Sequence, residues 1–234
     1  MPRRVGLIIP SSNRMVEQEM IHFFPRDVVA HVNRLRMTGP NRKPLSQLLP
    51  DVERAAAELV DAKCEAVAFH CTANSMAEGS GGEAALLEAL RRAEAPSVAT
   101  TSTAVINALR ALDANRIALV TPYTQQSTDE ETHFFDEAGI EVVYAKGCDR
   151  GGSDAYCSTP AEYWNAQAMT LPHKDFDVLF LSCANIQCLG IVHDIEQSLG
   201  RPVITSNQVV IWETLRLLGW NGADKPPGRL FSVY

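Results

Sequence analysis

AVAFHC, at residues 66–71, has a counterpart 112 residues later in VLFLSC, at residues 178–183. Each segment is a short apolar run, which is typical of a strand buried on both faces of a parallel sheet. Each run ends on a cysteine. VGLIIP at residues 5–10 and IALVTP at residues 117–122 share the offset of 112, and APSVAT at residues 95–100 resembles RPVITS at residues 201–206 with an offset of 106. Three matches in the same order predict two similar halves.

The rest of the chain fits this division. Short apolar segments predict strands at Val5–Ile9, Val28–Val32, Ala66–His70, Ser97–Ala99, Arg116–Thr121, Glu141–Tyr144, Val178–Ser182 and Pro202–Thr205. Apolar residues at helical spacing predict helices at Leu48–Lys63, Glu83–Ala93, Thr103–Leu112, Asp129–Ala138, Pro160–Thr170 and Gln208–Leu218. Strands that alternate with helices of this length indicate an α/β fold with parallel sheets.

We therefore expect two parallel-sheet α/β halves related by a pseudo-twofold axis. The first half is predicted over residues 1–103 and the second over 104–206, with residues 207–234 packing back on the first half. Ligands of open α/β sheets bind beyond the carboxyl ends of the strands. Both repeated cysteines, Cys71 and Cys183, follow such ends. We expect them to face each other across a cleft between the halves.

Composition excludes several classes of function. The 234 residues carry a formal net charge of −7 and contain no basic stripe, which argues against nucleic acid or an anionic membrane as a partner. No apolar run reaches the ~18 residues of a membrane span, and the short apolar run after the N-terminus is too short for a signal peptide. The sequence therefore predicts a soluble, cytoplasmic protein.

The chain contains six cysteines, which could bind a metal, fill the core or take part in catalysis. They form no CxxC pair and no Cys/His spacing that suits zinc, so we expect no metal. In a cytoplasmic chain most cysteines are small buried hydrophobic residues. We assign that role to those without a repeat partner, which are Cys64, Cys148, Cys157 and Cys188.

The matched pair can do chemistry. Small polar residues follow each cysteine, and main-chain N–H groups at a strand-to-helix turn favour an anion or a thiolate. One sulfur can then act as base or nucleophile and the other as acid, if their environments differ. The alternative is that Cys71 and Cys183 are core residues at equivalent positions of a repeat.

The same residues resemble a known family. Two pseudosymmetric halves, each with a cysteine after a parallel strand, resemble the aspartate/glutamate racemase superfamily. GLIIPSSN at residues 6–13, CTA at 71–73, TPY at 121–123, LSCAN at 181–185 and SNQ at 206–208 resemble maleate cis-trans isomerases. Arylmalonate decarboxylases share the opening and the layout but typically lack the first cysteine.

The resemblance implies a cofactor-free isomerisation of a small dicarboxylate. The Cys71 thiolate would add to an alkene carbon of maleate, Cys183 would protonate the neighbouring carbon, and rotation followed by elimination would give fumarate. The substrate carboxylates need neutral donors, for which Asn13 and Tyr123 stand at equivalent turns of the two halves. The main-chain groups after the cysteines complete the expected binding set, namely Thr72, Ala73, Ala184 and Asn185. An N-cap or Asx-turn role for Asn13 and a plain turn role for Tyr123 remain open.

One stretch departs from the family pattern. The family has a further carboxylate-binding asparagine in the middle of the second half, where this chain reads GGSDAY at residues 151–156. Three alternatives to the isomerase therefore stay open. The first is an amino-acid or hydantoin racemase that uses the cysteines as opposed bases, the second an arylmalonate-type decarboxylase, and the third a catalytically idle protein that binds small carboxylates. A homodimer or homotetramer is expected.

Two other features are given ordinary roles. GSGG at residues 79–82 lacks the spacing of a nucleotide loop and is interpreted as a turn. His70 adjoins Cys71, but neighbouring side chains of a strand point to opposite faces. His70 is therefore a poor candidate for the base that activates this thiol.

Overall fold

The computed structural model describes residues 1–37, 43–172, 175–220 and 227–233, and it forms two four-stranded parallel sheets. The first sheet has the order β2-β1-β3-β4 and the second the order β6-β5-β7-β8. The strands of the first sheet are β1 (Arg3–Pro10), β2 (Val28–Leu35), β3 (Ala66–Phe69) and β4 (Val98–Thr100). Those of the second are β5 (Arg116–Thr121), β6 (Glu141–Gly147), β7 (Val178–Leu181) and β8 (Val203–Thr205). The predicted α/β fold with two similar parallel-sheet halves is confirmed.

The ladders define which residues of the two halves are equivalent. Phe69 pairs with Thr100 in the first sheet, and Leu181 pairs with Thr205 in the second. The offset of 112 holds between β3 and β7, but it is 105 between β4 and β8. The offset of 106 predicted from the matched prolines is therefore one residue wrong, because those prolines lie in the loops before the strands. Thr100 and Thr205 are the equivalent positions, and each caps the helix that follows it.

The helices cover both sheets. In the first half they are α1 (Val16–Phe23), α2 (Leu45–Asp61), α3 (Thr72–Met76), α4 (Gly79–Arg92) and α5 (Thr101–Ala111). In the second half they are α6 (Gln125–Glu137), α7 (Ser153–Ser158), α8 (Ala161–Met169) and α9 (Val192–Leu199). Helix α10 (Ser206–Leu217) follows β8 and lies in the segment expected to pack back on the first half. Short 3₁₀ helices follow at η1 (Leu189–Ile191) and η2 (Arg229–Ser232). GSGG is not a separate turn, because it forms the first residues of α4.

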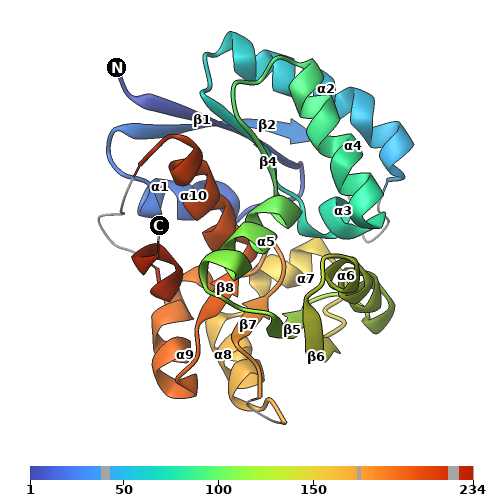
Figure 1. Ribbon diagram of the computed structural model, residues 1–234, viewed down its shortest axis with the longest axis vertical. Coiled ribbons are helices and arrows are strands. Elements are labelled where there is room, and N and C mark those ends of the chain that lie inside the picture. Colours follow the sequence, from blue (N-terminus) through green and yellow to red (C-terminus); the bar gives the residue numbers. More distant parts are fainter. Residues whose placement is uncertain (38–42, 173–174, 221–226, 234) are drawn as a thin grey trace.

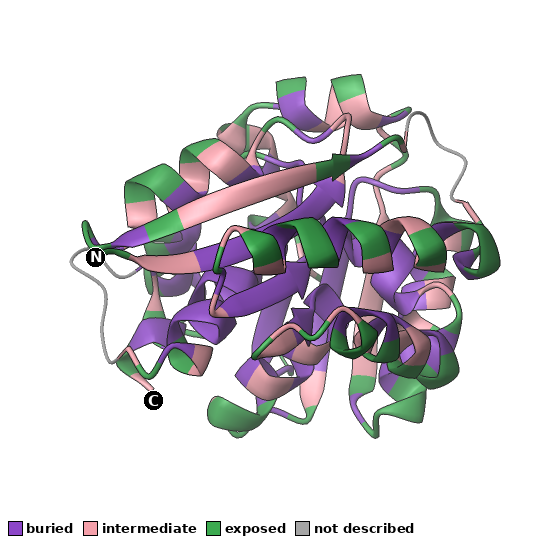
Figure 2. Ribbon diagram, turned by 90° about the horizontal axis from the view of Figure 1, so that it is seen from above, coloured by how far each residue is buried: buried purple, intermediate pink, exposed green. Residues whose placement is uncertain are grey.

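Helices α5 and α10 pack against each other between the two sheets (Figure 1). Although α10 follows the last strand of the second sheet, it also contacts β3, β4 and α1 of the first half. Buried side chains from both halves form one large apolar cluster. The central strands and the inner helix faces are buried, whereas the outer helix faces are exposed (Figure 2). The two strand ends that carry the cysteines are thereby held in a fixed relation.

Two further observations bear on the class of protein. Within the described ranges, no helix combines the length and the apolar character that a membrane crossing requires. Those same ranges contain no cluster of three or more His, Cys, Asp or Glu side chains that could hold a metal ion.

Candidate active site

A cavity of about 150 Å³ opens where the carboxyl ends of the strands of both halves meet. All eight residues that the sequence singles out line this cavity. They are Cys71, Thr72, Ala73 and Asn13 from the first half, and Tyr123, Cys183, Ala184 and Asn185 from the second. Among the described residues the lining also includes Pro10, Ser12, Met37, Asn74, Thr124, Ser127, Ser153 and Tyr156. The structure thus brings the two predicted cysteines to one site.

Cys71 lies at the junction between β3 and α3. Its backbone is extended, with φ −149° and ψ 103°, and it occupies the N-cap position of α3. Its Sγ lies 3.5 Å from Oδ1 of Asn74, one turn further along. The nitrogen of that amide donates to the carbonyl oxygen of Lys43 at 3.2 Å. The thiol is therefore oriented by a side chain that sequence analysis did not single out.

Cys183 lies at the equivalent end of β7 and is held by main-chain contacts. Its own N–H donates to Ser206 Oγ at 3.0 Å, and the N–H of Asn185 donates to its Sγ at 3.3 Å. Burial raises the pKa of Cys183 to about 12, although hydrogen bonds from Tyr123 and Asn185 act in the opposite direction. Negative charge on Glu131 and Cys71 raises the pKa further. Cys183 is therefore protonated near neutral pH and can donate a proton.

Tyr123 lies beside this sulfur, at the end of β5. Its side chain is 8% exposed and hydrogen-bonds Cys183. Burial, followed by the negative charges of Cys183 and Glu131, raises the pKa of Tyr123 well above its usual value. The phenol therefore stays protonated and serves as a donor to the sulfur.

The side-chain amides of Asn13 and Asn185, predicted to bind substrate, both hydrogen-bond other groups of the protein. Asn13 Oδ1 accepts hydrogen bonds from the N–H groups of Met15 and Val16 at the start of α1, at 3.0 and 3.1 Å. Its Nδ2 donates to Ala184 O at 2.8 Å, across the boundary between the halves. Asn13 thus forms the Asx-turn that the sequence left open, whereas the N-cap position of α1 is Met15. A role in substrate binding can only use the second hydrogen of its amide.

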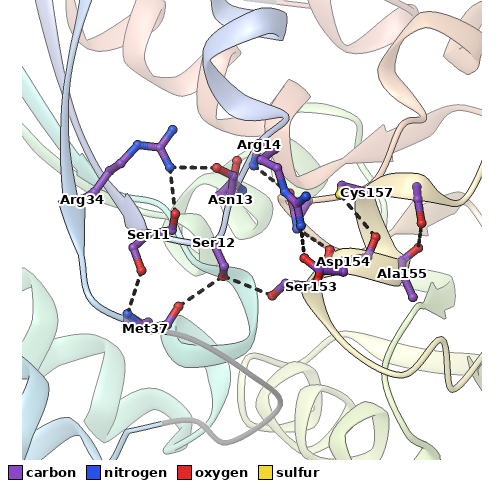
Figure 3. Close-up of polar contacts among 12 residues, drawn as sticks. Ser11, Ser12, Asn13, Arg14, Arg34, Met37, Ser153, Asp154, Ala155 and Cys157 are labelled. Atoms are coloured by element: carbon purple, nitrogen blue, oxygen red, sulfur yellow. Dashed lines mark hydrogen bonds and ion pairs between the residues drawn. The ribbon is translucent and has the colours of Figure 1, made fainter.

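Asn185 makes the reciprocal connection. Its Oδ1 accepts from the N–H of Arg14 at 2.9 Å, and its Nδ2 donates to Ser153 O at 3.0 Å. Ser12 and Ser153 approach each other to 3.1 Å between their hydroxyl oxygens, and Arg14 pairs with Asp154 (Figure 3). These contacts tie the loop after β1 to the start of α7 along one edge of the cavity.

A second cross-half connection lies behind the cysteines. The hydroxyl of Thr72 donates to Ser206 Oγ at 2.8 Å, and this same oxygen accepts from Cys183 N–H. Ser206 is fully buried at the first position of α10. One hydroxyl therefore contacts both cysteine-bearing loops. The sequence indicates no role for this hydroxyl, although Ser206 is the first residue of the SNQ stretch at residues 206–208.

His70 points away from Cys71, as the strand alternation predicts. Its ring nitrogens lie 2.9 Å from Thr101 Oγ1 and 2.8 Å from Asn207 Oδ1. Complete burial lowers the pKa of His70 to about 4, so the ring is neutral at physiological pH. Asn207 also donates to Glu19, whose pKa is raised by burial to about 7. His70 thus belongs to a buried polar chain that joins β3, α10 and α1.

Comparisons with known proteins agree with this geometry. A family model described as arylmalonate decarboxylase matches residues 5–231. A maleate isomerase of Nocardia farcinica (strain IFM 10152) is 30% identical over 238 residues, which cover 97% of this chain and 95% of that protein. An arylmalonate decarboxylase of Bordetella bronchiseptica is 27% identical, and the match covers 97% of this chain and 96% of that protein.

Solved structures show the same likeness. A cysteine-to-serine variant of Nocardia farcinica maleate cis-trans isomerase, with a covalently bound succinylcysteine intermediate, has a TM-score of 0.90 and 28% identity. That match covers 99% of this chain and 98% of the other. A cysteine-to-alanine variant of the maleate isomerase Iso from Pseudomonas putida S16, with maleate, has a TM-score of 0.91 and 25% identity over 100% and 98% of the two chains. The chain therefore belongs to the arylmalonate decarboxylase family, whose model spans residues 5–231, and maleate isomerases are among its relatives.

Proposed function

We propose that this protein is an isomerase that converts a small cis-unsaturated dicarboxylate of the maleate type to its trans isomer, without a cofactor. The observation that carries the proposal is the pair Cys71 and Cys183, which come from equivalent strand ends and line one cavity. A relative with the same fold holds a succinylcysteine intermediate. Such an adduct is what addition of a cysteine sulfur to maleate gives.

The reaction balances with these two groups alone. The Cys71 thiolate forms a C–S bond to one alkene carbon, and the alkene electron pair takes the proton of the Cys183 thiol at the neighbouring carbon. The carbon–carbon bond is now single and rotates. The Cys183 thiolate then removes a proton, the double bond reforms and the C–S bond breaks. Covalent catalysis thereby replaces rotation about a double bond, which has a high barrier, with several steps of lower barrier.

The environment of Cys183 supports its role as the acid. Burial keeps the proton on Cys183, and negative charge on Cys71 raises the pKa of Cys183 further. One thiolate in the cavity therefore disfavours a second one. Once Cys183 has given up its proton, Tyr123 and the N–H of Asn185 stabilise the resulting thiolate.

The same cavity provides donors for the carboxylates. We assign substrate binding to Asn13, Thr72, Ala73, Tyr123, Ala184 and Asn185, all of which line it. The first N–H groups of a helix have no acceptor within that helix, so those at the start of α3 suit one carboxylate. Asn13 and Asn185 also fix the wall, through the bonds they make to the opposite half.

Proton NMR tests the reaction directly. The parent protein is expected to convert maleate to fumarate without added metal or cofactor, and Cys71→Ala and Cys183→Ala are each expected to lose at least about a thousandfold in kcat. In Cys183→Ser, intact mass spectrometry should reveal maleate bound to Cys71. An adduct on Cys183 instead would reverse the roles. Deuterium incorporation at the α-carbon of an amino acid, with no turnover of maleate, would favour a racemase.

Decarboxylation of an arylmalonate is the second candidate, because the matching family model carries that description. This reaction needs one proton donor after loss of carbon dioxide, a role that Cys183 could fill. An arylmalonate decarboxylase would therefore keep its activity in Cys71→Ala. Loss of all turnover in that variant favours the isomerase.

Assembly and location are further proposals. We expect a homodimer or homotetramer in the cytoplasm. Light scattering of the purified protein measures the oligomeric state. We also keep the division at residues 103/104, which falls within the first turn of α5, with residues 207–234 assigned to the first half. The contacts of α10 with β3 and β4 support that last assignment.

A further inference from the structure

No cationic side chain is found among the described residues that line the cavity. A dicarboxylate has two negative groups, and each loses hydrogen bonds to water when it is buried. Neutral N–H and O–H donors must replace that water at both ends of the molecule. Which donors can do so depends on the hydrogens that the protein has already committed.

Three amides line the cavity, and the protein holds each at both its oxygen and its nitrogen. They belong to Asn13, Asn74 and Asn185. Their nitrogens donate to main-chain carbonyls at 2.8–3.2 Å, namely those of Ala184, Lys43 and Ser153. Each amide plane is therefore fixed by the fold, and only one hydrogen per amide remains.

Most of the hydroxyl groups in the lining are committed as well. Thr72 donates to Ser206, and Tyr123 hydrogen-bonds Cys183. Ser12 lies 3.1 Å from both the carbonyl oxygen of Met37 and the hydroxyl of Ser153 (Figure 3). A hydroxyl has a single hydrogen, so the side chains of Thr72 and Tyr123 can donate to a substrate only by giving up these bonds.

Tyr156 differs from them. It lies in α7, lines the cavity and packs edge-on against the Tyr123 ring, with 5.6 Å between the ring centroids. Across residues 1–37, 43–172, 175–220 and 227–233, its hydroxyl makes no hydrogen bond. Burial, together with negative charge on Cys183 and Asp149, raises the pKa of Tyr156 to about 12. The phenol therefore keeps its proton at physiological pH and can donate a hydrogen bond near Cys183.

One other hydroxyl in the lining lacks an acceptor within the described residues, that of Ser127. Its oxygen accepts from exposed Thr124 at 3.4 Å in the first turn of α6. This contact places Ser127 toward the solvent-exposed rim. Tyr156 instead lies against Tyr123, which contacts Cys183 directly.

We infer that the Tyr156 hydroxyl donates to the second carboxylate of the substrate and thereby selects dicarboxylates over monocarboxylates of the same shape. This inference rests on the proposed dicarboxylate chemistry of the cavity. It makes Tyr156 a specificity-determining residue, because its hydroxyl meets the distal carboxylate and not the reacting carbons.

The test compares maleate with cis-but-2-enoate, in which a methyl group replaces one carboxylate. Binding is measured by calorimetry in Cys71→Ala, where neither ligand can react. Adding Tyr156→Phe should weaken maleate binding roughly tenfold or more, since a hydrogen bond to a charged group contributes about 1.5–3 kcal/mol. Binding of cis-but-2-enoate should change less than about twofold. An equal change for both ligands, or none for maleate, would overturn the inference.

Kinetics provide a second measurement in the presence of Cys71. Tyr156→Phe should raise KM for maleate about tenfold and lower kcat less than about threefold, because the lost bond is present in both ground state and transition state. Tyr156→Gln keeps a neutral donor and should retain more of the preference for maleate than Phe does. A fall in kcat with unchanged KM would contradict the assignment.

Two control variants sharpen the result. Tyr163→Phe removes another phenol of the second half, one that does not line the cavity, and should match the parent. Ser127→Ala tests the hydroxyl at the rim. If Ser127→Ala loses maleate binding selectively and Tyr156→Phe does not, the proposal is wrong. If the parent fails to isomerise maleate but Tyr156→Phe still erases the preference for maleate, the proposed function fails and the role of Tyr156 stands.

Discussion

Glu19, which is partly buried, shows how far one side chain can depart from its usual chemistry. Its carboxyl group accepts a hydrogen bond from Asn207, whose oxygen contacts the ring of His70. Burial raises the pKa of Glu19 to about 7. His70, fully buried, shifts in the other direction, to a pKa of about 4. Both shifts favour the uncharged form, as expected where charge is taken from water.

Glu19→Gln should change the pH dependence of stability. In the parent the folded state holds the Glu19 proton more tightly than the unfolded state, so this group's contribution to the free energy of unfolding falls as pH rises from about 4.5 to about 7. The glutamine variant lacks this slope. Urea unfolding at half-unit steps from pH 4.5 to 8 measures the free energy of unfolding of both proteins. The titration of His70 affects the two curves equally, so their difference reports on Glu19. Parallel curves would show that Glu19 is not perturbed.

Asn13 and Asn185 mark the limit of sequence reasoning at this scale. Their residue type and their place after strand ends predict that they line the site, and they do. One partner of each lies 171 positions away in the chain, at Ala184 for Asn13 and at Arg14 for Asn185. Such partners depend on how the halves meet, which no local pattern contains.

Helix α10 combines several roles in its first three residues. Ser206 contacts both cysteine-bearing loops, Asn207 holds His70 and Glu19, and Gln208 completes a capping box with Thr205. The start of this helix thus supports both cysteine-bearing loops. Ser206 positions Cys183 without lining the cavity.

Ser206→Ala should lower kcat about tenfold with little change in KM, because it releases Cys183 N–H and the hydroxyl of Thr72 together. The loss of two buried partners should reduce the free energy of unfolding by about 1–3 kcal/mol. Ser206→Thr, which keeps the oxygen, should recover most of kcat. Thr214→Ala is the matched control, because among the described residues this buried hydroxyl of the same helix bonds only to the carbonyl oxygens of Val210 and Ile211. Equal kinetics in Ser206→Ala and Thr214→Ala would leave Ser206 a structural residue only.

The strands were accessible from the sequence, whereas several helices were not. Short apolar segments identify all eight strands, and those of the central strands β1, β3, β5 and β7 are almost wholly buried. The edge strands β2 and β6 are partly exposed, and each is still recognised by its apolar residues. The short helices α1, α3, α7 and α9 lack a long enough apolar period. The glycines of α4 suggested a turn, but Gly82 serves a close approach: a Cβ there would lie 2.8 Å from Leu45 at the start of α2. That packing reason is invisible before α2 and α4 are placed side by side.

At the scale of the whole molecule, the halves meet through buried hydrogen bonds and a shared core. Asn13 reaches Ala184, and Thr72 reaches Ser206, each across the boundary. The exposed pair Arg14–Asp154 adds little by comparison, because a surface ion pair contributes at most about 1 kcal/mol. The alignment of the cysteines therefore depends on the buried bonds.

The neutral cavity wall has a consequence for how substrate arrives. The protein has a net charge of −7, and its arginines beside the site, Arg14 and Arg34, are paired with Asp154 and Glu17. A dianion is therefore repelled during its approach. Raising ionic strength from about 0.01 to 0.15 M shortens the screening length from about 30 to 8 Å and weakens that repulsion. For maleate, kcat/KM should rise roughly twofold with an inert salt over this range, whereas a falling rate would reveal attraction. Assays in dilute buffer would then understate the turnover that the protein reaches at physiological ionic strength.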